Sequence, residues 1–300
     1  MIELECTTGG ISMSGVRFAV LYNKLDASYS MPRKHEHEHY EIYYLVSGDR
    51  FYFIEDQIYH VHQGDLVFIS KGYIHRTTDA DSNIGSHARY VVYFTEEMLE
   101  QMLSDAQIKE LLSCFYHEAK VIHLTVSQQN FVEGLLKKMI SEYIQQHPYK
   151  NLYQQILLTE LLLFANQLNF DLAPNYFNDL NPIYHTIHKI IQYIRKNYQE
   201  KLNLAKIAHQ FYISPYYLSR MFKQVTGLTL TEYLNNTRIK AAQHLLLTSD
   251  LPVSEISEQV GYESHTHFCR VFKQFTNVSP MQYRKGSIRT ETSTGFRQIT

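Results

Sequence analysis

The sequence has few cysteines and no apolar run long enough to cross a membrane. Its three cysteines, Cys6, Cys114 and Cys269, are scattered and show neither a disulfide framework nor a zinc-binding spacing, as in proteins of a reducing cytosol. The apolar run 161–165 is far shorter than the about 20 residues that a spanning helix needs. The N-terminus lacks the basic and then apolar pattern of a secretion signal. We therefore expect a soluble, cytoplasmic protein with no membrane partner.

A strong overall charge is also missing, because the formal net charge of the 300 residues is only −2. The charge is nevertheless divided unevenly. Residues 183–300 hold 15 Lys and Arg and 7 Asp and Glu, a net charge of +8, whereas residues 1–182 hold 13 basic and 23 acidic residues, a net charge of −10. A chain of this length has room for about two domains. The asymmetry predicts a C-terminal half that binds nucleic acid and an N-terminal half that does not.

One pattern occurs twice between Leu204 and Tyr283. The matching pairs at an offset of 50 are Arg220/Arg270, Phe222/Phe272, Lys223/Lys273, Gln224/Gln274, Thr226/Thr276 and Tyr233/Tyr283. Apolar pairs upstream match at an offset of 49, so the second copy has one extra residue in a turn near positions 261–263. Each copy is typical of a helix, a short turn and a second helix. Two copies are too few for a solenoid and predict a tandem helix-turn-helix.

Local signals support a second helix in each copy. Ser214 and Ser264 suit N-caps, Pro215 suits a first helical position, and Gly227 suits a C-cap. The outward faces would carry polar residues, namely Tyr216, Ser219, Arg220 and Lys223 in the first copy and His265, Thr266, Cys269, Arg270 and Lys273 in the second. Such faces can be ordinary solvated surface. Arg and Lys at equivalent places in two copies favour helices that contact bases in the major groove, with a helix over 230–247 holding them apart.

Residues 187–284 resemble the DNA-binding domain of the AraC/XylS family of transcription regulators. The matching residues are Ile207, Ala208, Ser214, Tyr217, Leu218, Ser219, Arg220, Phe222, Lys223, Thr226, Gly227, Tyr233, Val260, Gly261, Tyr262, His267, Phe268, Arg270, Phe272, Lys273, Ser279, Pro280, Tyr283 and Arg284. The resemblance implies two recognition helices per chain, base contacts from Tyr216, Ser219, Arg220, His265, Thr266, Cys269 and Arg270, and RNA polymerase as a partner. Asn277 replaces the glycine usual in the family, and Cys269 stands where a hydroxyl or amide is common.

The N-terminal region has the pattern of an all-β domain. Runs of β-branched and aromatic residues separated by turn residues predict strands over 16–22, 41–46, 50–54, 57–61, 65–69 and 89–94. Many short strands with regular turns are typical of a barrel or jelly roll. Residues 96–170 are predicted to be helical, over 96–115, 131–144 and 152–168. The last of these helices is apolar nearly all round, so it would need partners on more than one side, either beneath the barrel or in a dimer.

Two groups of histidines fall within the strand-rich region. The segment 35–41 and the residues Gly64, Gly72 and His75 resemble the two cupin motifs. The resemblance implies a divalent metal held by His37, His39, Glu41 and His75, with His35 as a competing ligand. Side chains two apart on a strand share a face, and imidazole with carboxylate suits Zn, Mn, Fe or Ni. The alternative is a metal-free pocket in which these residues and Tyr43 bind a small polar molecule such as a sugar.

These observations predict a multidomain protein, in which an all-β cupin-like barrel with appended helices is followed by an all-α DNA-binding domain. The expected parts are a sensor over 1–95, a helical packing or dimerisation region over 96–170, a linker over 171–182, a tandem helix-turn-helix domain over 183–286 and a flexible tail over 287–300. We expect a homodimeric regulator, an activator, that binds double-stranded promoter DNA and responds to a small-molecule effector. The alternative is a metal-dependent cupin enzyme tethered to DNA. The duplicated DNA module argues against an enzyme.

Overall fold

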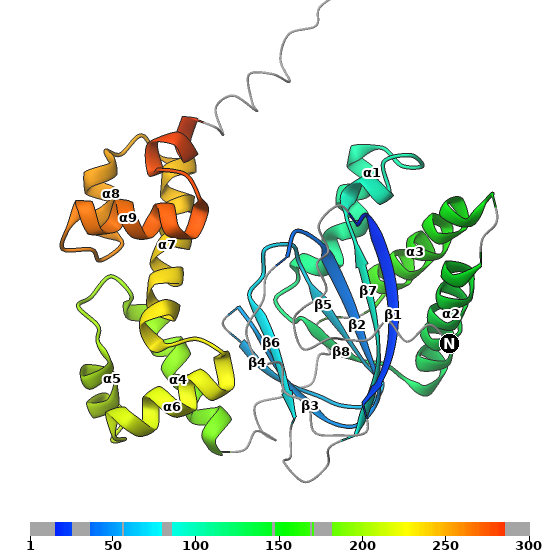
Figure 1. Ribbon diagram of the computed structural model, residues 1–300, viewed down its shortest axis with the longest axis horizontal. Coiled ribbons are helices and arrows are strands. Elements are labelled where there is room, and N and C mark those ends of the chain that lie inside the picture. The colour runs from blue at the N-terminus through cyan, green and yellow to red at the C-terminus, as the bar shows by residue number, and fades with distance from the viewer. Residues whose placement is uncertain are drawn as a thin grey trace, which may run out of the picture. The chain divides into compact units, whose positions relative to one another are not determined.

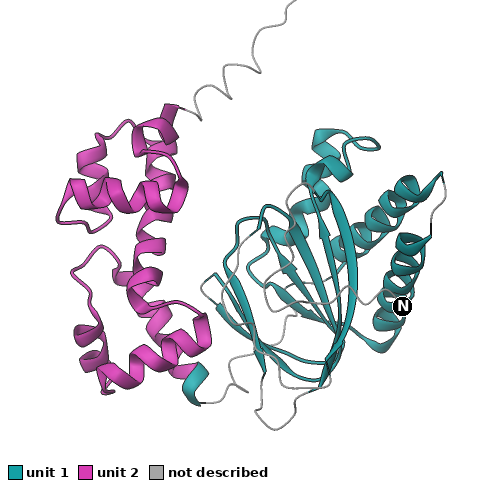
Figure 2. Cartoon of the chain, viewed as in Figure 1, with its two compact units in different colours: residues 1–184 teal, residues 185–300 magenta. Residues whose placement is uncertain are grey.

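The computed structural model describes residues 16–25, 37–55, 57–79, 86–145, 148–168, 170 and 182–285, and it divides the chain into two compact units (Figures 1 and 2). Unit 1 is residues 1–184 and unit 2 is residues 185–300. The predicted tail and all of the predicted linker except Pro182 lie outside the described residues. No helix in the described ranges is long and apolar enough to cross a membrane.

Unit 1 contains two antiparallel sheets, which confirms the predicted β-domain. The five-stranded sheet has the order β1 (Phe18–Leu25), β7 (His87–Phe94), β2 (Tyr40–Ser47), β5 (Asp65–Ile69) and β8 (Val121–His123). The three-stranded sheet has the order β4 (Gln57–Val61), β3 (Arg50–Ile54) and β6 (His75–Asp79). The strands predicted over 50–54, 57–61 and 65–69 match β3, β4 and β5 residue for residue.

Strand β2 has two buried faces. Tyr40, Ile42 and Tyr44 pack in the core that the large sheet shares with the helices, whereas Tyr43 and Leu45 pack in the core between the two sheets. The alternation follows from the period of two along a strand. Figure 1 shows helices α2 and α3 on the side of the large sheet away from the small one. Because Glu41 lies on the same face as Tyr43, the strand places a carboxylate between the sheets.

The region predicted to be helical contains a strand. It forms the 3-10 helix η1 (Glu96–Met98), α1 (Asp105–Leu111), the 3-10 helix η2 (Leu112–Tyr116), β8, α2 (Val126–Ile144) and α3 (Lys150–Asn166). The prediction of one helix over 96–115 is therefore wrong, and β8 was not predicted. Val121 and Ile122 bury opposite faces in the two cores, as neighbouring residues of a strand do.

Unit 2 consists of helices in its described part. They are α4 (Pro182–Asn197, which begins in unit 1), α5 (Leu204–Gln210), α6 (Pro215–Thr226), α7 (Leu230–Thr248), α8 (Val253–Gln259) and α9 (His265–Thr276). The pair α5–α6 and the pair α8–α9 lie at the two ends of α7 (Figure 1). Both limits of α8 are 49 residues after those of α5, and both limits of α9 are 50 after those of α6. The extra residue therefore lies in the second turn, as predicted.

The predicted caps of the second helices are confirmed. The Ser214 hydroxyl accepts a hydrogen bond from the backbone N–H of Tyr217, and Ser264 does the same for His267. Gly227 ends α6 in the left-handed conformation, with φ 75°. Asn277 ends α9 in the same conformation, with φ 60°, because a short polar side chain tolerates this region better than most others. The departure from glycine thus preserves the helix end.

Candidate functional site

A group of two histidines and one glutamate lies between the sheets of unit 1. Glu41 belongs to β2, His75 begins β6, and His37 precedes β2 by three residues. The Oε2 atom of Glu41 is 3.0 Å from Nε2 of His37 and 3.3 Å from Nε2 of His75. Glu41 and His75 are fully buried, and His37 is mostly buried. The fold therefore brings three of the four predicted metal ligands to one point.

The other nitrogen of each ring is held by the backbone. Nδ1 of His37 donates to the carbonyl of His39 at 2.9 Å, and Nδ1 of His75 donates to the carbonyl of Tyr73 at 2.9 Å. A carbonyl oxygen can only accept, so both Nδ1 atoms carry the proton. This arrangement orients both Nε2 atoms towards the Glu41 carboxylate. Metal-binding histidines commonly use the same contact to fix the ring and its tautomer.

Glu41 carries a negative charge in this setting. Burial alone would raise its pKa, but the charge of His75 and the hydrogen bonds from His37 and His75 outweigh burial, and the pKa of Glu41 lies well below its usual range. Burial lowers the pKa of His37, yet its hydrogen bond and attraction to Glu41 raise the pKa above 6.5 overall. The group combines one carboxylate with two imidazoles, a donor set that suits a divalent transition metal.

The remaining residues predicted for this site are His39, Tyr43 and His35. The ring of His39 lies 6.0 Å from that of His37, but its Nε2 contacts the carbonyl of Val16 at 2.6 Å, and no donor atom of His39 belongs to the group. The reason is that β2 begins at Tyr40, and strand alternation does not apply before it. Tyr43 lies in the same interior, where its ring contacts Tyr52 edge-on at 5.0 Å between centroids. His35 is outside the described residues.

Tyr93 was missed by the sequence reasoning. It lies opposite Glu41 in the β2–β7 register, and its ring meets that of His37 edge-on, with centroids 5.3 Å apart. Strand pairing is needed to recognise it, because positions 41 and 93 are far apart in the sequence. Tyr93 therefore forms one side of the histidine–glutamate group.

The predicted recognition helices expose the predicted residues. On α6, Tyr216, Ser219, Arg220 and Lys223 are exposed, while Leu218, Met221, Phe222 and Val225 are buried. On α9, His265, Thr266, Arg270 and Lys273 are exposed, Cys269 is half-buried, and Phe268, Val271 and Phe272 are buried. Sγ of Cys269 lies 3.6 Å from Nε2 of His265. Both helices thus carry a polar face that can meet DNA on a firmly packed apolar base.

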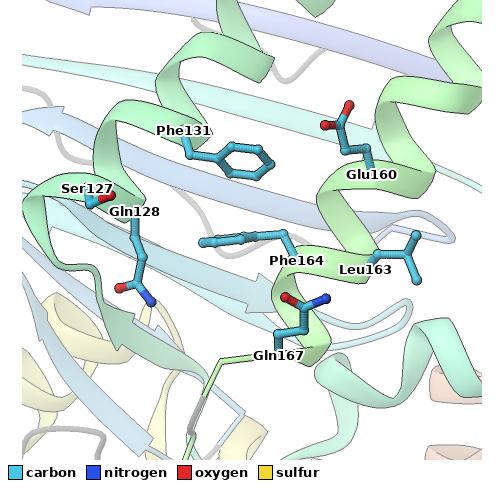
Figure 3. Close-up of a pocket in the computed structure, with 7 residues that line it drawn as sticks. All are labelled: Ser127, Gln128, Phe131, Glu160, Leu163, Phe164 and Gln167. Atoms are coloured by element: carbon cyan, nitrogen blue, oxygen red, sulfur yellow. The ribbon is translucent and has the colours of Figure 1, made fainter.

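A surface groove lies between α2 and α3 (Figure 3). Phe131 of α2 and Phe164 of α3 contact each other there, with ring centroids 4.9 Å apart. Phe131 and Leu163 are exposed although they are apolar. Residues of the histidine–glutamate group do not line the groove, which is formed by Ser127, Gln128, Phe131, Glu160, Leu163, Phe164 and Gln167.

The fold and these sites define a protein with a β-sheet ligand-binding domain followed by a tandem helix-turn-helix domain. Residues 21–162 match the model of the AraC-like ligand-binding domain, and residues 207–286 match a helix-turn-helix domain model. The chain belongs to the AraC family of transcription regulators.

Curated relatives carry the same kind of name. The chain is 27% identical to the HTH-type transcriptional regulator YdeC of Bacillus subtilis, over 84% of this chain and 85% of YdeC. It is 24% identical to the HTH-type transcriptional activator RhaS of Escherichia coli, over 84% of this chain and 87% of RhaS. It is 40% identical to the HTH-type transcriptional regulator YijO of Escherichia coli, but this match covers only 32% of the present chain and 34% of YijO.

Solved structures give a weaker comparison. The structure of ToxT from Vibrio cholerae is 14% identical in sequence and matches with a TM-score of 0.33, over 90% of this chain and 98% of that one. Because the TM-score is below 0.5, this likeness supports no conclusion about the present chain.

Proposed function

We propose that the protein is a homodimeric activator of transcription that binds promoter DNA through residues 183–286 and senses an effector through its β-domain. The observation that carries this proposal is the pair of matched helices α6 and α9, each capped by serine, packed by its apolar face and exposed on its polar face. The net charge of +8 over residues 183–300 favours contact with phosphates. Activation through RNA polymerase is suggested by the similarity to RhaS. Its DNA partner leads us to expect it in the cytoplasm.

The proposed DNA contacts come from the exposed faces of both helices. Arg220 and Arg270 are suited to bridge O6 and N7 of guanine, and Lys223 and Lys273 are suited to phosphates. Shorter polar side chains complete each face, namely Tyr216 and Ser219 on α6 and His265, Thr266 and Cys269 on α9. Each chain would then read two segments of major groove.

Replacing the two arginines one at a time tests this assignment. Arg220→Ala and Arg270→Ala should each weaken binding to the promoter by about 1–3 kcal/mol and relax the base preference at a different position. The measurement is binding to a library of promoter variants at fixed salt with random DNA as competitor. Lys196→Ala, which removes an exposed positive charge from α4, is the control. If both arginine variants keep the affinity and the base preferences of the unmodified protein, the recognition faces are wrongly assigned.

For the sensor, we propose a divalent metal ion at His37, Glu41 and His75. The support is the pair of Nε2 atoms directed at one carboxylate, with both Nδ1 atoms held by carbonyls. The protein should retain metal after dialysis, and His75→Ala should retain one equivalent less, while His209→Ala should retain as much as the unmodified protein. If His75→Ala abolishes the response to an effector and no metal is found in either protein, the same side chains and Tyr43 bind a polar effector, such as a sugar, directly.

For the dimer, we propose that two copies meet at the groove between α2 and α3. The exposed Phe131 and Leu163 support this surface, because apolar groups on a helix pair are stabilised by a partner. Phe131→Glu with Leu163→Glu should give a monomer in sedimentation experiments. Tyr149→Glu, at an exposed aromatic outside the groove, should leave the dimer intact. Sedimentation of the double variant as a dimer would exclude this surface.

We propose that the protein is a regulator rather than an enzyme. Its curated relatives YdeC and RhaS are named as transcriptional regulators. The donor set at Glu41 is then a sensing site. Loss of promoter activation in the His75→Ala variant, with no change in the affinity of the isolated effector-free protein for DNA, is the result expected of a sensor.

A further inference from the structure

A second group of possible metal ligands occurs on the hairpin formed by β3 and β4. Asp49 immediately precedes β3, His60 belongs to β4, and His62 immediately follows β4. We propose that these three residues bind a divalent transition metal ion of the Zn²⁺ type, and that the ion joins the two ends of the hairpin. The site is independent of the proposed regulatory function and of the histidine–glutamate group.

The strand register explains why the three residues lie on one face. Arg50 pairs with Val61 and Phe51 pairs with His60, so one further step places Asp49 opposite His62. His60 and His62 are two apart and therefore point the same way. Tyr59 and Val61 point into the core between the sheets, so the two histidines point away from it. A His-X-His pair on one strand thus faces a carboxylate on its neighbour.

The distances between the donor atoms fit a small metal ion. Oδ1 of Asp49 is 2.7 Å from Nδ1 of His62 and 3.8 Å from Nε2 of His60, and the two imidazole centroids are 4.0 Å apart. One donor atom from each residue lies within 4.8 Å of the others. Ligands about 2.0–2.1 Å from a tetrahedral zinc ion are roughly 3.3 Å apart. The two measured distances lie on either side of this value, and the donor atoms of the two histidines lie within 4.8 Å of each other.

The backbone on both sides of the site is held in place. The N–H of His62 donates to Oδ2 of Asp65 at 2.7 Å, and Asp65 is fully buried. The other oxygen of Asp65 accepts from Nδ1 of His123 at 2.7 Å. Asp49 follows Gly48, which has φ 93° and leaves no room for a side chain, since a Cβ there would lie 2.9 Å from Cβ of His87. The backbone that carries Asp49 and His62 is therefore held in place before an ion arrives.

The site is also accessible. The side chains of His62 and Asp49 are 40% and 47% exposed, whereas that of His60 is 15% exposed, so an ion would enter from the side of His62 and Asp49. The hairpin site is spatially separate from the histidine–glutamate group. His75 pairs with Ile54 at one end of β3 and points into the core, whereas Asp49 lies beyond the other end. Variants can therefore remove one group without touching the other.

The experiment is a titration of the full-length protein with Zn²⁺ against a chelating competitor, after removal of all metal. The unmodified protein should bind one equivalent more than Asp49→Asn, His60→Ala or His62→Ala. Each of these variants should lower the affinity for that Zn²⁺ ion by more than about 10–100-fold. This is the loss seen when a residue that only hydrogen-bonds a metal ligand is replaced. His209→Ala, which removes an exposed histidine from α5, should bind as the unmodified protein does. Circular dichroism checks that each variant is folded.

Two further comparisons make the result decisive. His75→Ala should keep the hairpin equivalent, so a failure of the inner site does not remove the outer one. Co²⁺ bound at the hairpin should show visible absorption bands that disappear in Asp49→Asn and His62→Ala. The stoichiometry and affinity for Zn²⁺ could instead be the same in the unmodified protein and in all three hairpin variants. Asp49 and His62 would then be an ordinary surface ion pair with His60 beside it, and the proposal would be wrong.

Discussion

His87 is a buried histidine beside two arginines. It is 2% exposed, and Nη1 of Arg50 lies 3.5 Å from its Nδ1, while Arg50 also pairs with Asp79. Burial, followed by the charges of Arg50 and Arg89, lowers the pKa of His87 from 6.5 to about 3. His87 is therefore neutral in the folded protein at any physiological pH, and its Nδ1 can accept from Arg50.

This shift makes the stability of the β-domain depend on pH. The unfolded chain protonates His87 near pH 6.5, whereas the folded chain does so only near pH 3. Between these values the unfolded state binds more protons, so the free energy of unfolding decreases as the pH falls, by up to about 1.4 kcal/mol per pH unit. Urea unfolding at pH 7, 6 and 5 should show that His87→Gln removes this part of the pH dependence. His209→Gln should retain it, and equal pH slopes in all three proteins would contradict the prediction.

The histidine–glutamate group shows what residue patterns can and cannot predict. His37, Glu41 and His75 were expected as metal ligands because their segments resemble the two cupin motifs. The exclusion of His39 depends on the residue at which β2 begins, and the presence of Tyr93 depends on strand register. The hairpin group of Asp49, His60 and His62 likewise needs the pairing of β3 with β4. These are long-range facts that a local pattern does not contain.

At the scale of elements, helices were easier to predict than short strands. Helices α6 and α9 have serine caps, apolar faces at helical spacing and left-handed ends, so several local signals agree. Strand β6 has the sequence His-Arg-Thr-Thr-Asp, which lacks an apolar alternation, and β8 has only three residues. Their conformation is set by hydrogen bonds to β3 and β5 rather than by their own composition.

The turns of the two helix-turn-helix copies differ at one equivalent position. Tyr212 and Gly261 both have a positive φ, 55° and 90°. This conformation costs an ordinary residue about 1–2 kcal/mol and costs glycine almost nothing. Tyr212 is 94% exposed, so little packing is lost when its side chain is removed. At Gly261 a Cβ would lie 2.7 Å from the carbonyl oxygen of Gln199. The first turn is therefore strained where the second is relaxed.

Substitutions in the two turns should have opposite effects on stability. Tyr212→Gly should raise the free energy of unfolding of unit 2 by about 0.5–1 kcal/mol, after allowance for the flexibility of glycine in the unfolded chain. Gly261→Ala should lower it by more than 1 kcal/mol, since it adds both strain and a collision (~1–2 kcal/mol for the backbone alone). Hydrogen exchange of the amides of α5 and α8 measures both changes. Tyr212→Ala removes the same ring without relieving the backbone, so an equal gain from alanine would refute the explanation.

At the scale of the whole molecule, the two units divide the charge between them. The net charge of residues 1–182 is −10 and that of residues 183–300 is +8, although the chain as a whole is nearly neutral. The exposed lysines Lys223 and Lys273 occupy equivalent positions on α6 and α9. If both helices bind phosphates at once, each lysine displaces about one counterion from the DNA. The salt dependence of binding then reports how many of the two helices are engaged.

The slope of log K against log salt concentration should therefore fall by about one for each lysine removed. Lys223→Ala and Lys273→Ala should each reduce the slope by this amount, and the double variant by about twice as much, because the two helices lie at opposite ends of α7. Affinity should fall alike on promoter and random DNA, since phosphates carry no sequence. The measurement is fluorescence anisotropy from low to physiological salt, with Lys196→Ala as the control for lost charge. A slope reduced by Lys223→Ala alone would mean that only the first helix-turn-helix engages DNA.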